Sequence, residues 1–465
     1  MHDIKKNIRR VFWLYFALFF LVVAYLGNFI LIESASMINS TFNPRLNRND
    51  RSIKRGYIFD SLGNVLAESV LAGDLYRRVF PFENEFAHTV GFIGITKSGI
   101  EARYNFTLDN LDFEIIQRIQ REFFGGRVQG DNVHLTLEQP MQRLAVEGLR
   151  GIRGGVVAMD PRTGRIIAMA SSPDFSPANV GDIWGDLLSD NENSPLLNRA
   201  SQGLYPPGSV FKIITADAII NHLPYYEDFY VNCEGVHIFN GESLQCFDAR
   251  PHGRVNLHEA MKYSCNIFFA AALMEIGHER LIESAERMGF NRSLPFDLEA
   301  VISRFSMDEE AGTGEIIQTA IGQGRTLVTP LCMALVTSAV ANEGIVMEPF
   351  IAERITAPTG RVKWERRPAV LTGFMEAHNA NLIKEMMIAV VEGGTGTPAG
   401  VSGVMVAGKT GTAQNPAGSP HGWFVSFAPA HNPEIVLAIV TENTGGSARA
   451  LEITRTMLTA YFEEE

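Results

Sequence analysis

Three short motifs carry residue types that acyl-transfer chemistry uses. The first, Tyr205-Pro206-Pro207-Gly208-Ser209-Val210-Phe211-Lys212, places a serine and a lysine three residues apart. Because two prolines and a glycine disfavour a helix interior, we expect a helix to begin at Ser209, with Ser209 and Lys212 on one face. Apolar neighbours predict that this helix is buried and that the lysine amine loses hydration, which depresses its pKa. A neutral amine beside a hydroxyl suits a serine nucleophile with its general base. A capping serine and a snorkelling lysine are the structural alternative.

The second motif, Tyr263-Ser264-Cys265-Asn266, interrupts two apolar helical runs. If the backbone is extended across this break, Ser264 and Asn266 face one way and Cys265 faces the other. A hydroxyl in that place can relay a proton, and an amide can hold a substrate amide. A simple helix cap is the alternative for these polar residues.

The third motif, Gly408-Lys409-Thr410-Gly411-Thr412, follows a predicted strand at 404–406. The run from Gly403 to Thr410 also fits the G-x-x-x-x-G-K-[ST] pattern of phosphate-binding loops, which needs a strand before it and a helix after it. The glycine-rich run before Gly403 and the prolines after Thr410 fit neither requirement. A cation and two hydroxyls on a strand edge suit the carboxylate of a bound peptide, with Gly411 leaving room for the peptide backbone.

The elements that must position these motifs form an α+β pattern. Strands are expected at 155–159 and 165–169, joined by a tight turn, and again at 423–427 and 434–440. Helical runs lie between them at 260–276 and 330–341, and a last helix is expected over 447–462. Thr136 followed by Gln139 predicts a capped helix that runs to Leu149. Strands at both ends with helices between predict one sheet that joins the two ends of the domain.

Composition excludes several classes of protein. The 465 residues are 46% hydrophobic and 20% charged, which excludes a disordered chain. The 40 Lys and Arg against 52 Asp and Glu give a net charge of −12, which disfavours nucleic-acid binding. Four cysteines without a C-x-x-C pair argue against a disulfide scaffold and against an ordinary zinc site. Cys233 and Cys246 are close enough in sequence to bridge, and two free buried thiols are the alternative.

The N-terminus predicts a membrane anchor. Lys5, Lys6, Arg9 and Arg10 precede an uncharged apolar run over 11–32, long enough to cross a bilayer and too long for a typical signal-peptide core. A cleaved signal peptide is the alternative, with small residues at 34–36. The basic cluster favours a cytoplasmic N-terminus, although further basic residues at 45–55 follow the run. We expect the rest of the chain to be one body outside the membrane.

Taken together, the motifs resemble those of class B penicillin-binding proteins, the monofunctional peptidoglycan transpeptidases. S-x-x-K, S-x-N and K-T-G occur in the family order. Cys265 stands where the family has an aspartate, while the serine and asparagine beside it are kept. Further stretches that are similar to family landmarks cover most of the chain: 55–60, 99–101, 135–137, 157–164, 198–200, 321–324 and 423–429.

The resemblance implies a domain plan and a fold. We expect a cytoplasmic tail at 1–10, a transmembrane anchor at 11–32, a small mixed α/β pedestal resembling a dimerisation domain at 33–150 and a transpeptidase domain at 151–465. The transpeptidase domain is expected to have the fold of the serine β-lactamases, an antiparallel sheet with helices. Longer relatives carry further C-terminal modules, which this chain is expected to lack.

The resemblance also implies chemistry at a D-Ala-D-Ala terminus. Ser209 would be the nucleophile and Lys212 its base, while Ser264 with Lys409 would pass a proton to the leaving amine. Asn266, Thr410, Gly411 and Thr412 would bind the peptide, with the backbone N–H groups of Ser209 and Thr412 as the oxyanion hole. No metal or organic cofactor is implied. The implied partners are stem peptides of nascent glycan strands, β-lactams as mimics, and a membrane glycan polymerase of the RodA/FtsW type.

Other functions fit the same residues. A D,D-carboxypeptidase or a β-lactamase would result if water reached the acyl-enzyme. A β-lactam sensor would need a cytoplasmic signalling domain, which we do not expect before the anchor. A non-catalytic scaffold for the polymerase belongs to a different class, and the intact Ser209, Lys212, Ser264 and Lys409 argue against it.

Overall fold

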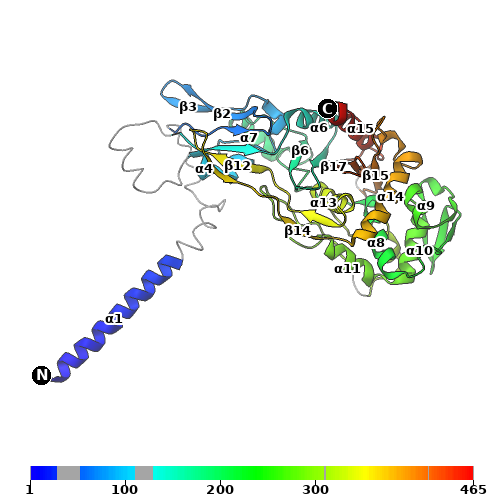
Figure 1. Cartoon of the computed structure of the whole chain (residues 1–465), viewed down its shortest axis with the longest axis horizontal. Helices are drawn as coiled ribbons and strands as arrows, with labels where there is room; N and C mark the ends of the chain where they lie inside the picture. The colour runs from blue at the N-terminus through cyan, green and yellow to red at the C-terminus, as the bar shows by residue number, and fades with distance from the viewer. Residues whose placement is uncertain (1, 29–52, 110–128, 308–309, 417, 464–465) are drawn as a thin grey trace.

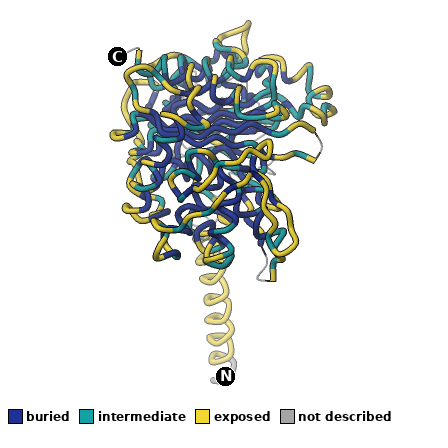
Figure 2. Tube along the Cα trace, turned by 90° about the vertical axis from the view of Figure 1, so that its right-hand side faces the viewer, coloured by how far each residue is buried: buried dark blue, intermediate teal, exposed yellow. Residues whose placement is uncertain are grey.

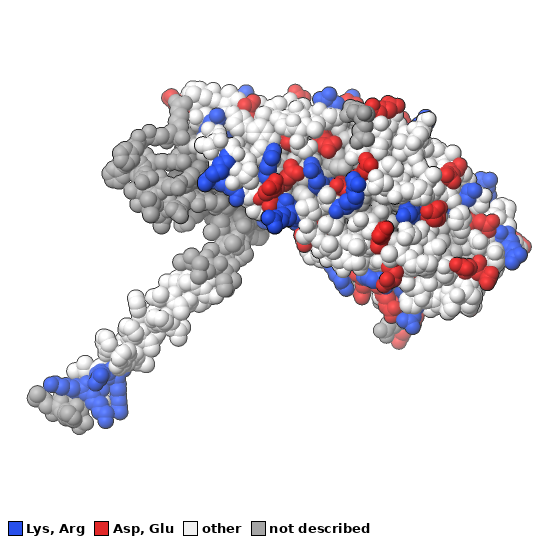
Figure 3. All heavy atoms as spheres, in the orientation of Figure 1, with Lys and Arg blue, Asp and Glu red and all other residues white. Residues whose placement is uncertain are grey.

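The computed structural model describes residues 2–28, 53–109, 129–307, 310–416 and 418–463. Its first element is the helix α1 (His2–Asn28), which stands away from the body (Figure 1). Within residues 5–28 of α1, an 18-residue stretch has a mean hydropathy of 2.0, and the helix is long and apolar enough to cross a membrane. In Figure 3 the helix is basic at its N-terminal end and uncharged along the rest. The helix begins inside the predicted tail at 1–10, and the predicted anchor residues 29–32 and the small residues 34–36 lie outside the described residues.

The central sheet has five antiparallel strands and joins the two ends of the domain, as predicted. Its order is β15 (Ala407–Ala413), β16 (His421–Ala428), β17 (Ile435–Thr441), β5 (Gly154–Met159) and β6 (Ile166–Ser172). Every residue of β16 and β17 is buried, and this sheet lies in the dark-blue centre of the body in Figure 2. Strands covered on both faces read as continuous apolar runs, which explains the sequence pattern at 435–441.

Helices cover both faces of this sheet. Alternate residues of β17 point to opposite sides: Leu437 and Ile439 pack in one cluster with α6 (Gln139–Gly148) and α15 (Ala448–Glu463). The other side packs on α13 (Pro330–Ala341), which is buried along its whole length. The remaining helices of the domain are α7 (Val180–Ser189), α8 (Lys212–His222), α9 (Leu257–Tyr263), α10 (Asn266–Ile276), α11 (Glu279–Arg287), α12 (Thr313–Thr319) and α14 (Ala377–Gly393).

Short strands surround the helical part. The segment between α8 and α9 carries β7 (Val231–Cys233), β8 (Val236–Phe239), β9 (Glu242–Gln245) and β10 (Gly253–Val255). β8 pairs with β9, and β7 pairs with β10. A further pair, β11 (Ile345–Met347) with β14 (Val370–Gly373), follows α13.

The N-terminal sheet draws strands from two distant parts of the sequence. Its order is β13 (Val362–Glu365), β12 (Ala352–Thr356), β4 (Asn132–Leu135), β1 (Ile58–Phe59), β2 (Val65–Ala72) and β3 (Leu75–Val79). β1 and β4 are parallel, and the other pairs are antiparallel. The predicted domain boundary between residues 150 and 151 stays a prediction. The structure adds that β12 and β13, from the second predicted domain, belong to the N-terminal sheet.

A buried charge cluster explains two stretches that the sequence analysis singled out. The Arg55 guanidinium lies 2.7 Å from Glu101 and 2.6 Å from Asp109, and Arg78 lies 2.6 Å from Glu101. Short helices α3 (Gly99–Arg103) and α4 (Asn105–Asp109) hold the two carboxylates. Buried charges need such partners, since breaking a buried pair typically costs about 3–5 kcal/mol.

One predicted helix start is wrong. α6 begins at Gln139 after the N-cap residue Glu138, which makes no side-chain capping hydrogen bond. The Thr136 hydroxyl instead donates to the carbonyl oxygen of Ile166 at 2.7 Å. Thr136 is completely buried, so its hydroxyl needs a hydrogen-bond partner inside the protein, and the carbonyl of Ile166, the first residue of β6, supplies it.

Candidate active site

The turn that bears Ser209 is tighter than predicted. Gly208–Phe211 form a 3₁₀ turn, and the α-helix α8 begins only at Lys212. Gly208 has a φ of +54°, and its N–H donates to the carbonyl oxygen of Gly322 at 2.8 Å. A Cβ on Gly322, which has a φ of +72°, would lie 2.1 Å from the Gly208 carbonyl oxygen. Two glycines therefore let two backbones approach and set the position of the serine.

Lys212 is completely buried, as the sequence predicted. Its Nζ donates to Ser264 O at 2.8 Å, to Ser264 Oγ at 3.1 Å and to Asn266 Oδ1 at 2.7 Å. Burial lowers the pKa of the Lys212 amine to about 8. An amine with that pKa is neutral in a useful fraction of molecules near neutral pH, which a general base requires.

The S-x-N motif faces Lys212 from the break between α9 and α10. Ser264 ends α9 in the left-handed conformation (φ +57°, ψ 43°), and Asn266 begins α10. The backbone is therefore not extended through Ser264. The turn still brings Ser264 and Asn266 to the same lysine, while Cys265 between them is completely buried.

The K-T-G motif lies inside a strand and not at its end. β15 begins at Ala407, later than the predicted 404–406, and Lys409 is its third residue. β15 is an edge strand of the sheet, as the peptide-binding interpretation requires. The chain continues from Thr410 along the strand and then into β16, which excludes the phosphate-loop geometry of a helix after the threonine.

Lys409 completes a hydrogen-bonded chain with the other two motifs. Its completely buried Nζ donates to Ser264 Oγ at 2.9 Å and to Thr410 O at 3.1 Å. Burial, and next the charge of Lys212, lower the pKa of Lys409 well below its usual range. The Ser264 hydroxyl therefore lies between two buried amines, and a proton can pass through it from one side to the other.

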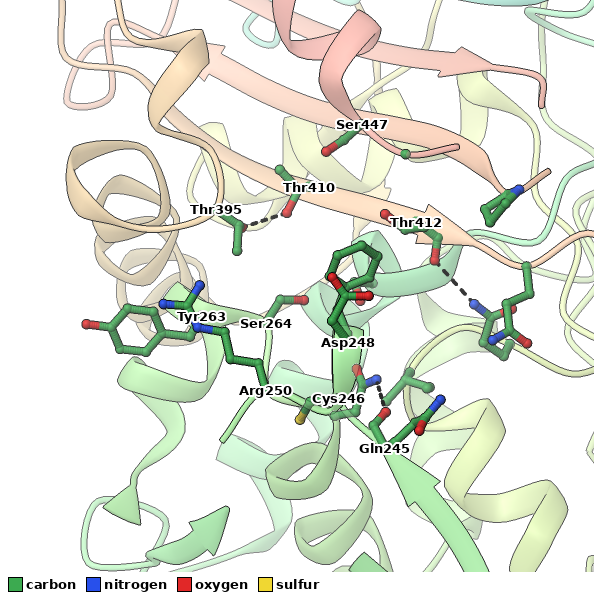
Figure 4. A pocket seen from close by; sticks show the side chains of 18 of the residues that line it. Gln245, Cys246, Asp248, Arg250, Tyr263, Ser264, Thr395, Thr410, Thr412 and Ser447 are labelled. Atoms are coloured by element: carbon green, nitrogen blue, oxygen red, sulfur yellow. Dashed lines mark hydrogen bonds between the residues drawn. The ribbon is translucent and has the colours of Figure 1, made fainter. Parts of the chain in front are cut away.

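A groove of about 1470 Å³ runs past these residues. Ser209, Ser264, Thr410 and Thr412 line it, and Figure 4 shows the labelled Ser264 opposite the two threonines of β15. Asn266 also lines the groove, and its Nδ2 donates to Gln245 O at 2.8 Å. The groove thus presents a serine hydroxyl and several hydrogen-bonding groups to a bound chain.

The space beside Gly411 is filled from within the protein. A Cβ there would lie 2.9 Å from Trp423 Cβ and 3.0 Å from both Pro207 O and Val210 Cγ1. Because glycine has no side chain, β15 can pack closely against the turn that carries Ser209. Protein atoms therefore fill the position that a side chain at residue 411 would occupy. That Gly411 also leaves room for a substrate backbone stays a prediction.

The structure adds groove residues that the sequence analysis missed. The Thr395 and Thr410 hydroxyls lie 2.6 Å apart (Figure 4). Gln323 Nε2 donates to Thr412 O at 3.3 Å. Asp248 and Arg250 reach the groove from the segment before β10. Gln323 belongs to a stretch that resembled a family landmark, which was the one available signal for it.

Comparison with known proteins decides the family. The family model described as "Penicillin binding protein transpeptidase domain" matches residues 154–459, and that of the "Penicillin binding protein A dimerisation domain" matches residues 55–133. The chain belongs to the penicillin-binding protein transpeptidases. Members of this family are serine acyl-transferases, and the mixed α/β fold described above is theirs.

Several relatives of this penicillin-binding transpeptidase are named or solved. Peptidoglycan D,D-transpeptidase PbpA of Mycolicibacterium smegmatis is 30% identical over 96% of this chain and 98% of its own. MrdA of Acinetobacter baumannii, also named a peptidoglycan D,D-transpeptidase, is 30% identical over 80% of this chain and 64% of its own. The ceftriaxone acyl-enzyme complex of penicillin-binding protein A from M. tuberculosis superposes with a TM-score of 0.83 at 27% identity, covering 89% and 99% of the two chains.

Proposed function

We propose that this penicillin-binding transpeptidase cross-links peptidoglycan stem peptides that end in D-Ala-D-Ala, through an acyl-enzyme on Ser209 that β-lactams also form. The observation that carries the proposal is the Ser264 hydroxyl, which accepts hydrogen bonds from Lys212 and Lys409 beside the groove that Ser209 lines. Three motifs that lie far apart in sequence meet at this one oxygen.

The first half of the reaction follows from this arrangement. Ser209 Oγ attacks the carbonyl carbon of the penultimate D-alanine, and Lys212 accepts the hydroxyl proton. The backbone N–H groups of Ser209 and Thr412 stabilise the oxyanion. When the tetrahedral intermediate collapses, the C–N bond breaks, and a proton passes through Ser264 to the leaving amine of the last D-alanine. The acyl group stays on Ser209.

The second half reverses these steps with a different amine. An amino group of a second stem peptide attacks the ester carbon and loses a proton to the lysine–serine chain, and Ser209 Oγ leaves with a proton. Thr410 and Thr412 hold the terminal carboxylate of the donor peptide, and Asn266 holds its amide. Gly411 contributes through its backbone, because its side-chain position is filled by packing.

The membrane setting is part of the proposal. The helix α1 anchors the chain with a cytoplasmic N-terminus, and the body lies outside the cytoplasm, where stem peptides are cross-linked. The basic N-terminal end of α1 supports this orientation (Figure 3). The N-terminal sheet serves as a pedestal, and a glycan polymerase of the RodA/FtsW type is the expected partner.

The test uses the full chain in detergent with a fluorescent penicillin, followed by intact mass and identification of the labelled peptide. We expect one stable adduct on Ser209, which the Ser209→Ala variant lacks. A D-Ala-D-Ala stem peptide with an acceptor amine should then release D-alanine and form a cross-linked product. Rapid turnover of penicillin would indicate a β-lactamase, and hydrolysis without cross-linking a carboxypeptidase. A folded protein that takes no label would favour the scaffold function.

A further inference from the structure

The groove carries two opposite charges that the proposed chemistry does not use. Among the described residues that line it, Asp248 is the only Asp or Glu and Arg250 is the only Lys or Arg. Both side chains are exposed, and within the described part of the chain neither makes an ion pair or a side-chain hydrogen bond. Two unpaired charges on a loop beside a binding groove point to a ligand that supplies their partners.

A tight backbone turn fixes where these two side chains leave the chain. The N–H of Ala249 donates to Cys246 O at 3.0 Å, and the N–H of Arg250 donates to Phe247 O at 3.1 Å. Asp248 and Ala249 follow one another in the left-handed region, with φ of +52° and +50°. Residues with a Cβ keep this conformation where the surrounding structure holds them, which occurs most often at binding sites.

The turn is supported from behind by a neighbouring backbone. The N–H of Cys246 donates to Gly235 O at 2.8 Å, and a Cβ on Gly235 would lie 2.0 Å from Ala249 O. Cys233 and Cys246 are free thiols with sulfurs 3.6 Å apart, so the disulfide that the sequence allowed is not formed. Close backbone contacts therefore hold the turn, and Asp248 and Arg250 extend from fixed points.

The two charged side chains extend toward different parts of β15. Figure 4 shows the carboxylate of Asp248 on the side of the groove where Thr412 lies. Arg250 extends toward the side of Thr395, whose hydroxyl lies 2.6 Å from that of Thr410 (Figure 4). Along the strand, the negative charge thus lies toward Thr412 and the positive charge toward Thr410.

The free edge of β15 gives a bound donor peptide a direction. The carbonyl oxygens of Thr410 and Thr412 face the groove, since they accept from Lys409 Nζ and from Gln323 Nε2. In the proposed function the reacting carbonyl lies at the N–H of Thr412, and the terminal carboxylate lies further along, toward Thr410. The residue that precedes the two D-alanines then lies on the opposite side of the reacting carbonyl, beyond Thr412.

The charges on the groove wall match this direction. Neither Lys212 nor Lys409 is among the described residues that line the groove, and both amines donate to oxygens of the protein. Arg250 is therefore the cation available to the terminal carboxylate, and a guanidinium binds a carboxylate through two parallel N–H groups. At the other end, the carboxylate of Asp248 suits an ammonium group.

We propose that Asp248 and Arg250 select the donor peptide by its charges. Arg250 binds the terminal carboxylate, and Asp248 binds an ammonium group on the side chain of the residue that precedes D-Ala-D-Ala. The inference rests on the proposed function and adds the class of donor, a stem peptide with a cationic residue in that place. Because both groups lie at an exposed groove wall, the selection weakens as salt screens the charges.

The experiment measures the binding of four synthetic peptides to the full chain in detergent, with Ser209→Ala to prevent acylation. The peptides end in D-Ala-D-Ala or in its C-terminal amide, and the preceding residue is lysine or lysine acetylated on its side chain. We expect the peptide with both charges to bind about tenfold more tightly than either peptide that lacks one of them. High salt should reduce this difference.

Single substitutions assign each preference to one side chain. Asp248→Asn, which fits the left-handed conformation, should remove the preference for free lysine and keep the preference for the carboxylate. Arg250→Gln should do the reverse. Asp228→Asn and Arg254→Gln are the matched controls, because both residues are exposed in the segment between α8 and α9 and do not line the groove. They should keep both preferences.

Three results would overturn the proposal: equal binding of all four peptides, binding of none of them, or an equal loss for all four in Asp248→Asn and in Arg250→Gln. The last would mean that the two substitutions change the shape of the groove and not its charge selection. Penicillin labelling of the chain with Ser209 intact separates this proposal from the proposed function. Labelling without charge preference refutes the selection alone, and charge preference without labelling refutes the acyl-transfer chemistry alone.

Discussion

The pKa of Lys212 makes a quantitative prediction about the pH dependence of acylation. Burial lowers this pKa to about 8, whereas an ordinary lysine has a pKa of about 10.4. At pH 7 the neutral fraction is therefore about one in ten, against about one in 2,500 for an ordinary lysine. The buried site thus supplies about 200 times more neutral base, equivalent to about 3 kcal/mol.

The assay is the second-order rate of penicillin acylation of the full chain between pH 5.5 and 9.5. Because only the neutral amine accepts the Ser209 proton, the rate should fall about tenfold per pH unit below about pH 8 and level off above it. Lys212→Met, which keeps an apolar stem of similar length, should remove this pH-dependent rate while the protein stays folded. Lys262→Gln, a lysine in α9, should keep the wild-type profile.

Two results would refute this reasoning. A rate that stays flat from pH 6 to 9 would mean that no group with the pKa of Lys212 must lose a proton. A rate that keeps rising to pH 10 would mean that burial does not depress the pKa of the base. Thermal unfolding at each pH shows whether a loss of rate reflects a loss of folded protein.

Three further predictions follow from single residues. Ser264→Gly removes the hydroxyl between the two lysines, and glycine tolerates the positive φ at this position. Acylation should therefore slow by about 100-fold or more with little change in thermal stability. An unchanged rate would exclude proton transfer through Ser264. Gly322→Ala places a Cβ 2.1 Å from a backbone oxygen, so it should lower both the melting temperature and the acylation rate. Gly403→Ala is the control, because Gly403 also has a positive φ but its Cβ would meet nothing within 4 Å. Equal effects of the two substitutions would contradict the packing argument. Asp217 is completely buried and accepts hydrogen bonds from the buried Asn379 amide at 2.8 Å and the buried Ser284 hydroxyl at 3.2 Å. Asp217→Ala takes this acceptor from both donors and should cost about 3 kcal/mol or more in urea unfolding, whereas Glu283→Ala, in an exposed ion pair, should cost less than about 1 kcal/mol.

Sequence patterns predicted the elements whose signals are local. The helix expected over 330–341 has those bounds, because Thr329 caps it and a proline occupies its first position. The central sheet followed from apolar runs at both ends of the domain. The three motifs were also local, and their assembly around Ser264 needed only that the helices and β15 pack together.

Features that depend on contacts between distant residues could not be predicted. No glycine marks the left-handed turn at Ser264, which is held by contacts with Lys212 and Lys409. Thr136 does not cap a helix but donates a hydrogen bond to a carbonyl of β6. Its role depends on its burial, which the local sequence motif does not encode.

The two strands at 352–365 also bear on the order in which the chain acquires its structure. A polypeptide emerges from its N-terminus, and domains usually fold as they emerge. β4 is complete once residue 135 is available, but one of its two edges stays open until β12 arrives more than 200 residues later. Most of the catalytic body, including the segments of Ser209 and Ser264, is made in that interval. The N-terminal sheet is therefore completed by residues of the domain that follows it in sequence, and it can be completed only after α13 and the chain before it have been synthesised.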